Sequence, residues 1–331
     1  MSPFHYNRAA DVGQALAAVA ERSGAKFLGG GTNLIDLMKM GVETPTDLVD
    51  LHRLPLSQIE ELENKSVRLG AMARNSDVAE HPLIRERYPV LCQALLAGAS
   101  PQLRNMATVG GNLMQRTRCC YFYDPAFPAC NKRVPGSGCG AIQGYNRMHA
   151  ILGQSEHCIA THPSDMCVAL SALDAIVRVH GPQSERAIPL DEFHRLPGDH
   201  PESDTTLARD ELITAVDLPA ASSNLRSHYL KVRDRASYAF ALVSVAVVLD
   251  MGEDGKVRRA RVALGGVAHK PWRAKEAEEK LTGVSAGPEV FRAAADAALA
   301  QARGYPFNSF KIELARRSIV RALTTAAASN A

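Results

Sequence analysis

The sequence predicts an α+β protein built from three units, and two observations carry this prediction. The chain has 331 residues, which suits two or three domains that each bury a core of their own. Helical and strand-like segments mix through the first two thirds, whereas the last third places three strand-like runs before three helical ones. We expect the units to span residues 1–55, 56–222 and 223–331.

The first unit shows a small α/β pattern. Apolar residues recur at helical spacing over residues 11–22, which predicts an amphipathic helix. Short apolar runs at residues 25–28 and 47–51 predict two strands. Between these strands, Gly29–Gly31 form a turn before a helical pattern that starts near Leu34.

The second and third units follow from the same periodicities. In the second, we expect strands at 59–62, 67–72, 176–179 and 211–219, and helices at 83–97 and 165–175. An irregular stretch rich in Pro and Gly, residues 115–160, interrupts this unit. In the third, we expect an antiparallel meander of strands at 229–232, 240–249 and 257–267, then helices at 272–282, 288–303 and 308–327.

Composition excludes several classes of function. The 38 basic and 35 acidic residues nearly balance, and aromatic residues make up only 5%, so neither nucleic acid nor an anionic membrane is an expected partner. The longest apolar run, residues 240–249, is half of the roughly 20 residues that span a bilayer. Residues 1–10 contain neither an apolar stretch nor a twin arginine, so we expect no export signal of the chain's own.

Two glycine-rich loops suggest a nucleotide-type cofactor. Neither G-x-G-x-x-G nor G-x-x-x-x-G-K-[ST] is present in the sequence. Gly29–Asn33 lies between a strand and a helix, where successive backbone N–H groups can meet a pyrophosphate. Thr108–Asn112 offers a second such loop in another unit. The two loops could clamp one extended cofactor, or each could be a tight structural turn.

Six of the seven cysteines fall between residues 119 and 167. The spacing of Cys119, Cys130, Cys139 and Cys158 is not that of a C-x-x-C zinc ribbon or of a compact ferredoxin. We expect a metal centre that orders the irregular stretch, since metal-binding energy becomes folding energy. Zinc and a [4Fe–4S] cluster both accept four cysteines, and free thiols or a redox disulfide are the alternatives.

The remaining residues of this region have simpler expected roles. Cys92 and Cys167 sit in apolar helical patterns and are predicted to be core thiols. Nearby basic side chains are candidates to offset the negative charge of four thiolates: Arg116, Arg118, Lys132, Arg133 and Arg147.

Several long stretches resemble the FAD-binding subunit of molybdenum hydroxylases, the family of xanthine dehydrogenase and carbon monoxide dehydrogenase. These stretches are AKFLGGGTNLIDLMK, LRNMATVGGNL, ATHPSDM, KVRDRASYAFALVSVAV and VALGGVAHKPWR. QRTRC with YFYD, ACNKRVPGSGC and HCIATHPSD resemble the corresponding subunit of bacterial periplasmic aldehyde oxidoreductase. The resemblance covers essentially the whole chain.

This resemblance implies a fold and an FAD site. The fold is a two-subdomain FAD-binding module of the vanillyl-alcohol-oxidase type, followed by an α+β domain with a three-stranded antiparallel sheet and helices. The implied FAD-binding residues are Lys26, Phe27, Leu28, Gly29, Gly30, Gly31, Thr32, Asn33, Leu34, Ala99, Thr108, Gly110, Gly111, Asn112, Asp165, Ile213, Lys231 and Tyr238. Backbone N–H groups of Gly29–Thr32 would meet the pyrophosphate, and Asp165 would accept a hydrogen bond from the ribityl chain or the ring. Lys231 would place positive charge near the flavin, and Tyr238 is either a ring-stacking residue or a core aromatic.

The resemblance also implies a [4Fe–4S] cluster held by Cys119, Cys130, Cys139 and Cys158. An extra thiol, Cys120, follows directly after Cys119 and leaves open which of the two ligates. The motif in the resembling subunit has one cysteine directly after QRTR, which favours Cys119.

The implied function is electron transfer within a heterotrimer. A large molybdenum-cofactor subunit would oxidise aldehydes to carboxylic acids, and a small subunit with two [2Fe–2S] clusters would deliver electrons to FAD, which passes them to an external acceptor. We expect no catalytic acid or base in this chain. We expect assembly in the cytoplasm, with export on a partner's twin-arginine signal as the alternative location.

Other functions remain open from the sequence. Within the family, the chain could serve a xanthine dehydrogenase or an enzyme similar to 4-hydroxybenzoyl-CoA reductase. Outside it, the alternatives are a flavin oxidase with its own substrate site and a zinc-stabilised assembly scaffold.

Overall fold

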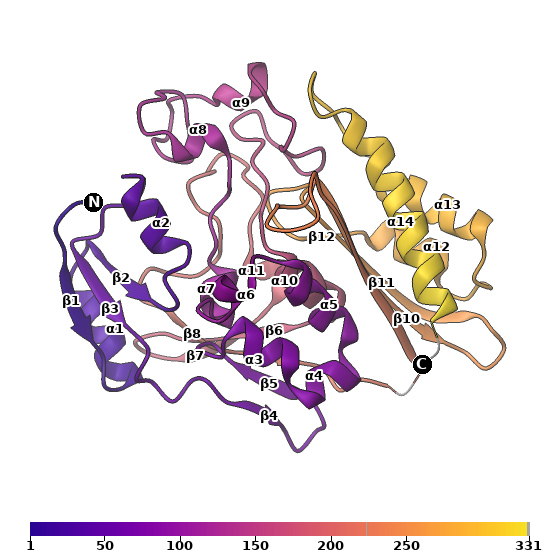
Figure 1. The fold of residues 1–331 in the computed structure, drawn as a ribbon, viewed down its shortest axis with the longest axis horizontal. Coiled ribbons are helices and arrows are strands. Elements are labelled where there is room, and N and C mark those ends of the chain that lie inside the picture. The colour runs from indigo at the N-terminus through magenta and orange to yellow at the C-terminus, as the bar shows by residue number, and fades with distance from the viewer. Residues whose placement is uncertain (223, 330–331) are drawn as a thin grey trace.

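Three sheets form the framework of the computed structural model, which describes residues 1–222 and 224–329 (Figure 1). The N-terminal sheet is wholly parallel, in the order β1 (His5–Arg8), β3 (Asp47–Asp50), β2 (Ala25–Leu28). Helix α1 (Val12–Glu21) starts where the Asp11 carboxylate accepts a hydrogen bond from the Gln14 backbone N–H at 2.8 Å. Helix α2 (Leu34–Lys39) follows the first glycine loop. The sequence analysis missed β1, because all four of its residues are exposed and carry no alternating apolar pattern.

The second sheet is antiparallel and has the order β4-β5-β8-β6-β7. Its strands are β4 (Ile59–Glu61), β5 (Val67–Gly70), β6 (Ile176–His180), β7 (Glu185–Pro189) and β8 (Leu212–Leu218). Across it, the Asp217 carboxylate accepts hydrogen bonds from Arg68 at 2.8 Å and from Arg178 at 2.7 Å. These bonds tie together three neighbouring strands.

Short helices lie between the strands of this sheet in the sequence. They are α3 (Asn75–Glu80), α4 (Pro82–Arg87), α5 (Pro89–Ala97), α6 (Pro101–Arg104), α7 (Val109–Leu113), α8 (Cys120–Tyr123), α9 (Gly140–Gln143), α10 (Asp165–Ala172) and α11 (Leu190–Phe193). The single helix predicted for residues 83–97 is wrong, since the structure divides it at Tyr88. Pro89 lacks the N–H that would continue the first helix, and it occupies the first position of α5 instead.

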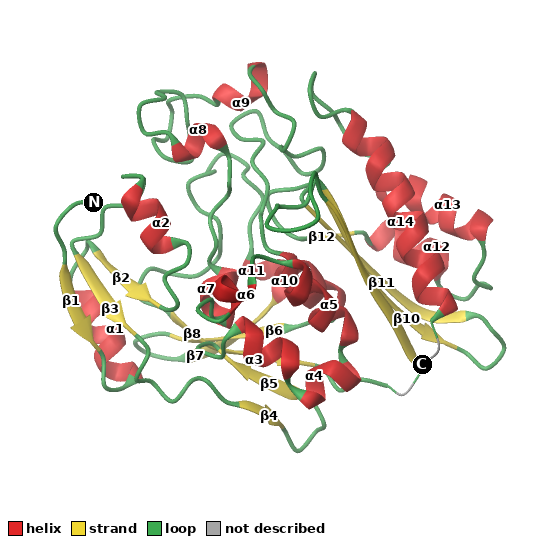
Figure 2. Cartoon of the chain, in the orientation of Figure 1, coloured by secondary structure: helices red, strands yellow, loops and turns green. Residues whose placement is uncertain are grey.

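The C-terminal sheet is antiparallel and carries its helices on one side (Figure 2). Strands β9 (Leu225–Val232), β10 (Val243–Met251) and β11 (Val257–Gly265) form the predicted meander, which is confirmed. A fourth strand, β12 (Trp272–Arg273), extends the expected three-stranded sheet; its two residues are too few to show a pattern. Helices α12 (Lys275–Leu281), α13 (Pro288–Ala298) and α14 (Phe310–Ala328) complete this part of the chain.

Strand β10 lies between two apolar cores, one on each of its faces. Val243, Val245 and Val247 pack into the core formed with helices α12 to α14. The alternating Ala246 and Val248 pack into the core that contains α5 and α10. Because both faces of this strand are buried, its sequence is a continuous apolar run rather than an alternating one. The α+β class expected from the sequence is confirmed.

The cysteine-bearing segment lies at one end of the molecule, at the top of Figure 1, between α2 and α14. It has little regular structure beyond the four-residue helices α8 and α9. A small apolar cluster of Leu37, Phe122 and Cys130 packs it against α2. Among the described residues, the structure contains no helix with the length and apolar character needed to cross a membrane.

Candidate cofactor cleft and cysteine centre

Two adjoining cavities form an extended cleft along the glycine loops. One has a volume of about 580 Å³ and the other about 990 Å³, both within the size range of ligand pockets. Gly30, Gly31 and Thr32 line both cavities, so the first glycine loop is the point where they meet. The space of the cleft therefore extends to both sides of the first glycine loop.

The two glycine loops pack directly against each other. A Cβ atom on Gly30 would lie 1.8 Å from the Met106 carbonyl oxygen, and one on Gly29 would lie 2.9 Å from the Thr108 hydroxyl. Only glycine permits this approach. The Thr108 hydroxyl also accepts a hydrogen bond from the Gly111 N–H at 3.2 Å, which fixes the second loop. Close contact between two separate segments is thus the reason for glycine at these positions.

The residues proposed for FAD binding divide between the two cavities. The 580 Å³ cavity is lined by Lys26, Phe27, Gly29–Leu34, Thr108, Gly110, Gly111 and Ile213. The 990 Å³ cavity is lined by Gly30–Thr32, Ala99, Asn112, Asp165, Lys231 and Tyr238. Leu28 lines neither cavity, and its side chain lies next to Gly31. The structure therefore brings together residues that lie far apart in the sequence.

Asp165 and Lys231 form a buried ion pair in the wall of the larger cavity. The Lys231 ammonium donates to one Asp165 carboxylate oxygen at 2.7 Å, and the Tyr229 hydroxyl donates to the other at 2.6 Å. Lys231 also donates to the Ala97 carbonyl at 3.1 Å. The positive charge that the resemblance places near the flavin is therefore paired with Asp165 in this structure.

Two residues of the larger cavity have left-handed backbone conformations. The φ angle is +50° at both Ala99 and Tyr238, a region that L-residues with side chains adopt rarely. Such strain gathers at ligand sites, where the surroundings enforce it. The Tyr238 side chain is 58% exposed, so this residue is not a core aromatic.

The side chain of Asn33, which also lines the smaller of the two cleft cavities, bonds to the cysteine-bearing segment. Its carbonyl oxygen accepts a hydrogen bond from the Arg116 backbone N–H at 2.8 Å, and its amide nitrogen donates to the Tyr123 hydroxyl at 3.1 Å. Asn33 therefore joins the first glycine loop to the cysteine-bearing segment.

The four proposed ligands Cys119, Cys130, Cys139 and Cys158 line one small cavity. The backbones of Cys130 and Cys139 form an isolated antiparallel β-bridge, not a disulfide. Cys158 comes from a separate stretch of chain. A hydrogen bond from Cys158 lowers the pKa of the Cys139 thiol to about 6, whereas burial raises the pKa of Cys119 to about 12. The segment thus folds around these four sulfurs.

The other cysteines lie elsewhere. Cys120 is exposed at the start of α8. Cys167 is fully buried in α10, and burial raises the pKa of its thiol to about 12. Cys92 is partly buried and its thiol donates to the Ala79 carbonyl at 3.1 Å.

The basic side chains near the cysteines already have protein partners. The Arg133 guanidinium donates to the carbonyls of Tyr121 and Phe122 at 2.7 and 3.0 Å. Arg147 pairs with Asp234 at 2.6 Å. Besides being candidate counter-charges, these side chains therefore bind backbone and carboxylate groups of the protein.

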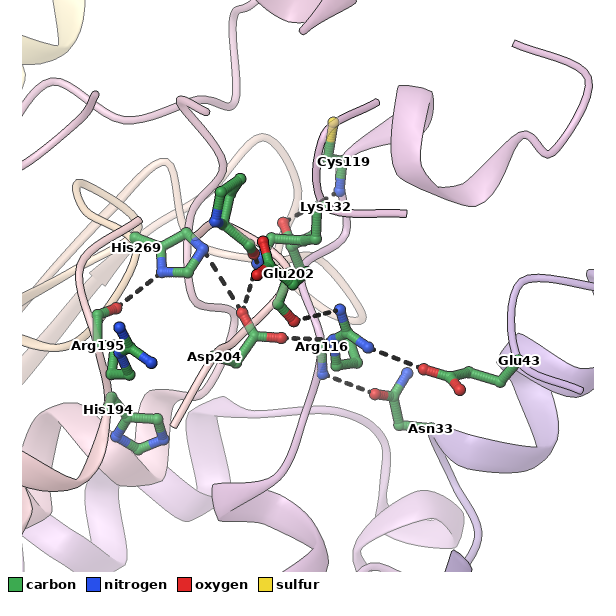
Figure 3. A network of polar contacts seen from close by, with 12 residues as sticks. Asn33, Glu43, Arg116, Cys119, Lys132, His194, Arg195, Glu202, Asp204 and His269 are labelled. Atoms are coloured by element: carbon green, nitrogen blue, oxygen red, sulfur yellow. Dashed lines mark hydrogen bonds and ion pairs between the residues drawn. The ribbon is translucent and has the colours of Figure 1, made fainter. Parts of the chain in front are cut away.

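A partly buried carboxylate, which the sequence pattern does not indicate, organises this region (Figure 3). Asp204 pairs with the Arg116 guanidinium and, at 2.5 Å, with the Lys132 ammonium. Arg116 in turn donates to Glu43 at 2.8 Å. Lys132 is 1% exposed and also donates to the Pro201 carbonyl at 2.6 Å. The sequence offered no signal for Asp204, which lies in a polar loop.

The electrostatic balance at Asp204 favours its charged form. Burial alone would raise the pKa of this carboxyl, but the charges of Lys132 and Arg116 outweigh burial and hold the pKa well below its usual value. The negative charge of Asp204 and the positive charges of Lys132 and Arg116 therefore stabilise one another in the protein interior.

Comparisons with known proteins agree with this geometry. The family model described as the FAD binding domain in molybdopterin dehydrogenase matches residues 2–221, and the CO dehydrogenase flavoprotein C-terminal domain matches residues 228–326. The chain is 50% identical to the aldehyde oxidoreductase FAD-binding subunit PaoB of Escherichia coli, over 99% of both chains. It is 29% identical to the carbon monoxide dehydrogenase medium chain of Hydrogenophaga pseudoflava, over 90% of this chain and 86% of the other.

Solved structures share the fold over nearly the full length. A chain of carbon monoxide dehydrogenase from Hydrogenophaga pseudoflava superposes with a TM-score of 0.77 at 27% identity, covering 98% of this chain and 97% of the other. A chain of the enzyme from Oligotropha carboxidovorans has a TM-score of 0.78 at 24% identity and covers both chains fully.

We expect Asp204→Asn to lower the free energy of unfolding by about 3 kcal/mol, because it leaves the buried Lys132 ammonium without its counter-charge. Urea unfolding followed by circular dichroism measures this change. Asp199→Asn, in an exposed side chain of the same loop, is the matched control and should change little. Equal stability of the two variants would contradict the role assigned to Asp204.

The same carboxylate predicts a pH dependence. Its folded-state pKa is lower than the unfolded value of about 4, so its contribution is present above pH 4 and is lost as the pH falls below it. An unperturbed Asp carboxyl takes up its proton around pH 4. As the pH falls from about 5 to about 3, the free energy of unfolding of the wild type should therefore fall more steeply than that of Asp204→Asn. Parallel pH profiles would show that Asp204 is not the group responsible.

Proposed function

Because the chain belongs to the FAD-binding subunits of the molybdenum hydroxylase family, we propose that it binds FAD along its extended cleft and a [4Fe–4S] cluster between its four clustered cysteines. The function that follows is electron transfer within an aldehyde oxidoreductase complex. Relatives in this family are oxidoreductase subunits, and the chain shares 50% identity with one from an aldehyde oxidoreductase. A xanthine dehydrogenase subunit is the second candidate, at 26% identity to a putative subunit of that kind from Escherichia coli.

The observation that carries the cluster proposal is the common cavity of Cys119, Cys130, Cys139 and Cys158. Thiolates are the usual ligands of iron–sulfur clusters. Within the described part of the chain, metal-ligating atoms of three residues come within 4.8 Å of one another only at His162, Cys167 and His194. In a four-thiolate zinc site, the sulfurs are about 3.8 Å apart at a Zn–S distance of about 2.3 Å. Among the described residues, no three of the four cysteine sulfurs lie within 4.8 Å of one another, which favours a larger group than one zinc ion.

Cofactor binding, not acid–base chemistry, is the proposed work of this chain. FAD, when bound, supplies the exchange between one-electron and two-electron transfer. Gly29–Thr32 would hold its pyrophosphate, while the Asp165–Lys231 pair and Tyr238 would border its flavin end. This leaves substrate oxidation to a partner with the molybdenum cofactor, and a small [2Fe–2S] subunit would deliver the electrons. We propose assembly with these partners in the cytoplasm, with export on a partner's signal as the second possibility.

We expect Cys130→Ser to lose iron from the complex, because it removes one of four thiolate ligands. Cys119→Ser should behave in the same way, whereas Cys120→Ser and Cys92→Ser should keep the wild-type iron content. Iron per chain, measured on the purified complex, tests this. Equal iron in Cys130→Ser and Cys92→Ser would refute the ligand set, and loss in Cys120→Ser alone would transfer the ligand role from Cys119.

We expect Gly30→Ala to weaken FAD binding at least about tenfold, or about 1.4 kcal/mol. Its Cβ would overlap the Met106 carbonyl and force the two glycine loops apart. Flavin released from the purified protein on denaturation gives the occupancy. Gly287→Ala places its Cβ in open space and is the control. Unchanged flavin in Gly30→Ala would place the cofactor elsewhere.

We expect the chain to co-purify with molybdenum when its partners are produced with it, and to oxidise no aldehyde on its own. Metal analysis of the complex and an assay of the isolated chain with an artificial electron acceptor test this. Aldehyde turnover by the isolated chain would instead indicate a self-contained flavin oxidase.

A further inference from the structure

His149 contacts one of the four clustered cysteines directly. Its Nε2 atom lies 3.1 Å from the Cys119 sulfur, and the residue is 4% exposed. The other ring nitrogen, Nδ1, has no hydrogen-bond partner in the part of the chain that the structure describes. The sulfur is therefore the polar atom toward which this buried ring is directed.

The backbone of His149 is held by buried donors from the far end of the chain. Its carbonyl oxygen accepts hydrogen bonds from the Lys311 ammonium at 2.8 Å and from the Asn308 amide at 3.3 Å. Its own N–H donates to the Asn146 carbonyl at 2.9 Å. Lys311 and Asn308 are both fully buried. Such support fixes the ring against the sulfur, as second-shell contacts fix metal ligands.

Cys119 and His149 also stand between two cavities. Both line the cavity of the four cysteines, and both line a neighbouring cavity of about 190 Å³. Arg118, Asp165 and Phe240 of that second cavity also line the 990 Å³ part of the proposed FAD cleft. The contact therefore lies on the side of the cysteine centre that faces the cleft.

A donor at this sulfur has a chemical consequence. A ligating thiolate carries negative charge, and reduction of a cluster adds more. An N–H group that donates to the sulfur stabilises the more negative, reduced state and so raises the reduction potential. Arg118 and Arg116, the basic residues nearest to Cys119 in the sequence, already donate to Asp36 at 3.4 Å and to Glu43 at 2.8 Å. His149 is thus placed to act on Cys119 where they are otherwise engaged.

We propose that His149 is a positioning residue that donates its Nε2–H to the Cys119 sulfur, helps to hold the four-cysteine centre and raises its reduction potential. This inference rests on the proposed cluster. It assigns the ring a role through Cys119, without direct ligation.

The test is a redox titration of the purified complex followed by electron paramagnetic resonance. The signal of the centre is identified as the one that Cys130→Ser lacks. His149→Leu removes the donor and should shift the potential of this signal to more negative values. His149→Gln keeps an N–H group near the Nε2 position and should restore a potential close to that of the wild type. His180→Leu, on β6, is the control histidine and should leave the potential unchanged.

Each outcome separates the two proposals. If Cys130→Ser kept both the signal and the iron of the wild type, the cluster itself would be overturned. An intact cluster with the same potential in His149→Leu and wild type would overturn only the role of His149, as would an equal shift in the Leu and Gln variants. Loss of iron in His149→Leu but not in His149→Gln would support the donor role. Loss of iron in both variants would overturn it, because the ring would then matter only for packing.

Discussion

The ion pairs of the partly buried Asp204 carboxylate are the interactions on which the arrangement of the two candidate sites depends. It neutralises Arg116 and Lys132, whose side chain is 1% exposed, and these two residues lie near the proposed ligands Cys119 and Cys130 in the sequence. Arg116 also reaches Glu43 beyond α2. Burial of any one of these charges alone would be strongly unfavourable, so each is stable only while the others are in place. Three segments of the chain are held together by this mutual requirement.

A polar network holds this region because its apolar contacts with the first unit are few. The segment of residues 115–160 contains mainly turns and four-residue helices, and its apolar contact with α2 is limited to a small cluster around Leu37, Phe122 and Cys130. Its backbone groups are instead satisfied by side chains such as Arg133 and Asn131. Hydrogen bonds are directional, and they specify one arrangement of the cysteines where packing would allow several.

The sequence predicted the elements that show a hydrophobic period and the residues that belong to a motif. It did not predict the contacts between residues that lie far apart in the chain. The apolar run of β10 and the meander were recognisable, because hydrophobic pattern reflects burial. Strand β1, with four exposed residues, and the two-residue β12 carry no such pattern. The pairing of Lys132 with Asp204 spans 72 positions, and nothing local marks either residue. The resemblance identified candidate ligands, but only the fold placed His149 beside Cys119.

One short run of chain serves both candidate sites. The Arg116 backbone N–H is bonded to Asn33 of the first glycine loop, Arg118 lines the cleft, and Cys119 lines the cysteine cavity. Within four residues the backbone cannot move at one site without moving at the other, since consecutive Cα atoms are about 3.8 Å apart. The distance between the two sites is therefore set by covalent geometry at this point, and the Asp204 network prevents the run from swinging away. The proposed electron transfer between two bound groups would need such a fixed separation, which here depends on a loop with almost no secondary structure.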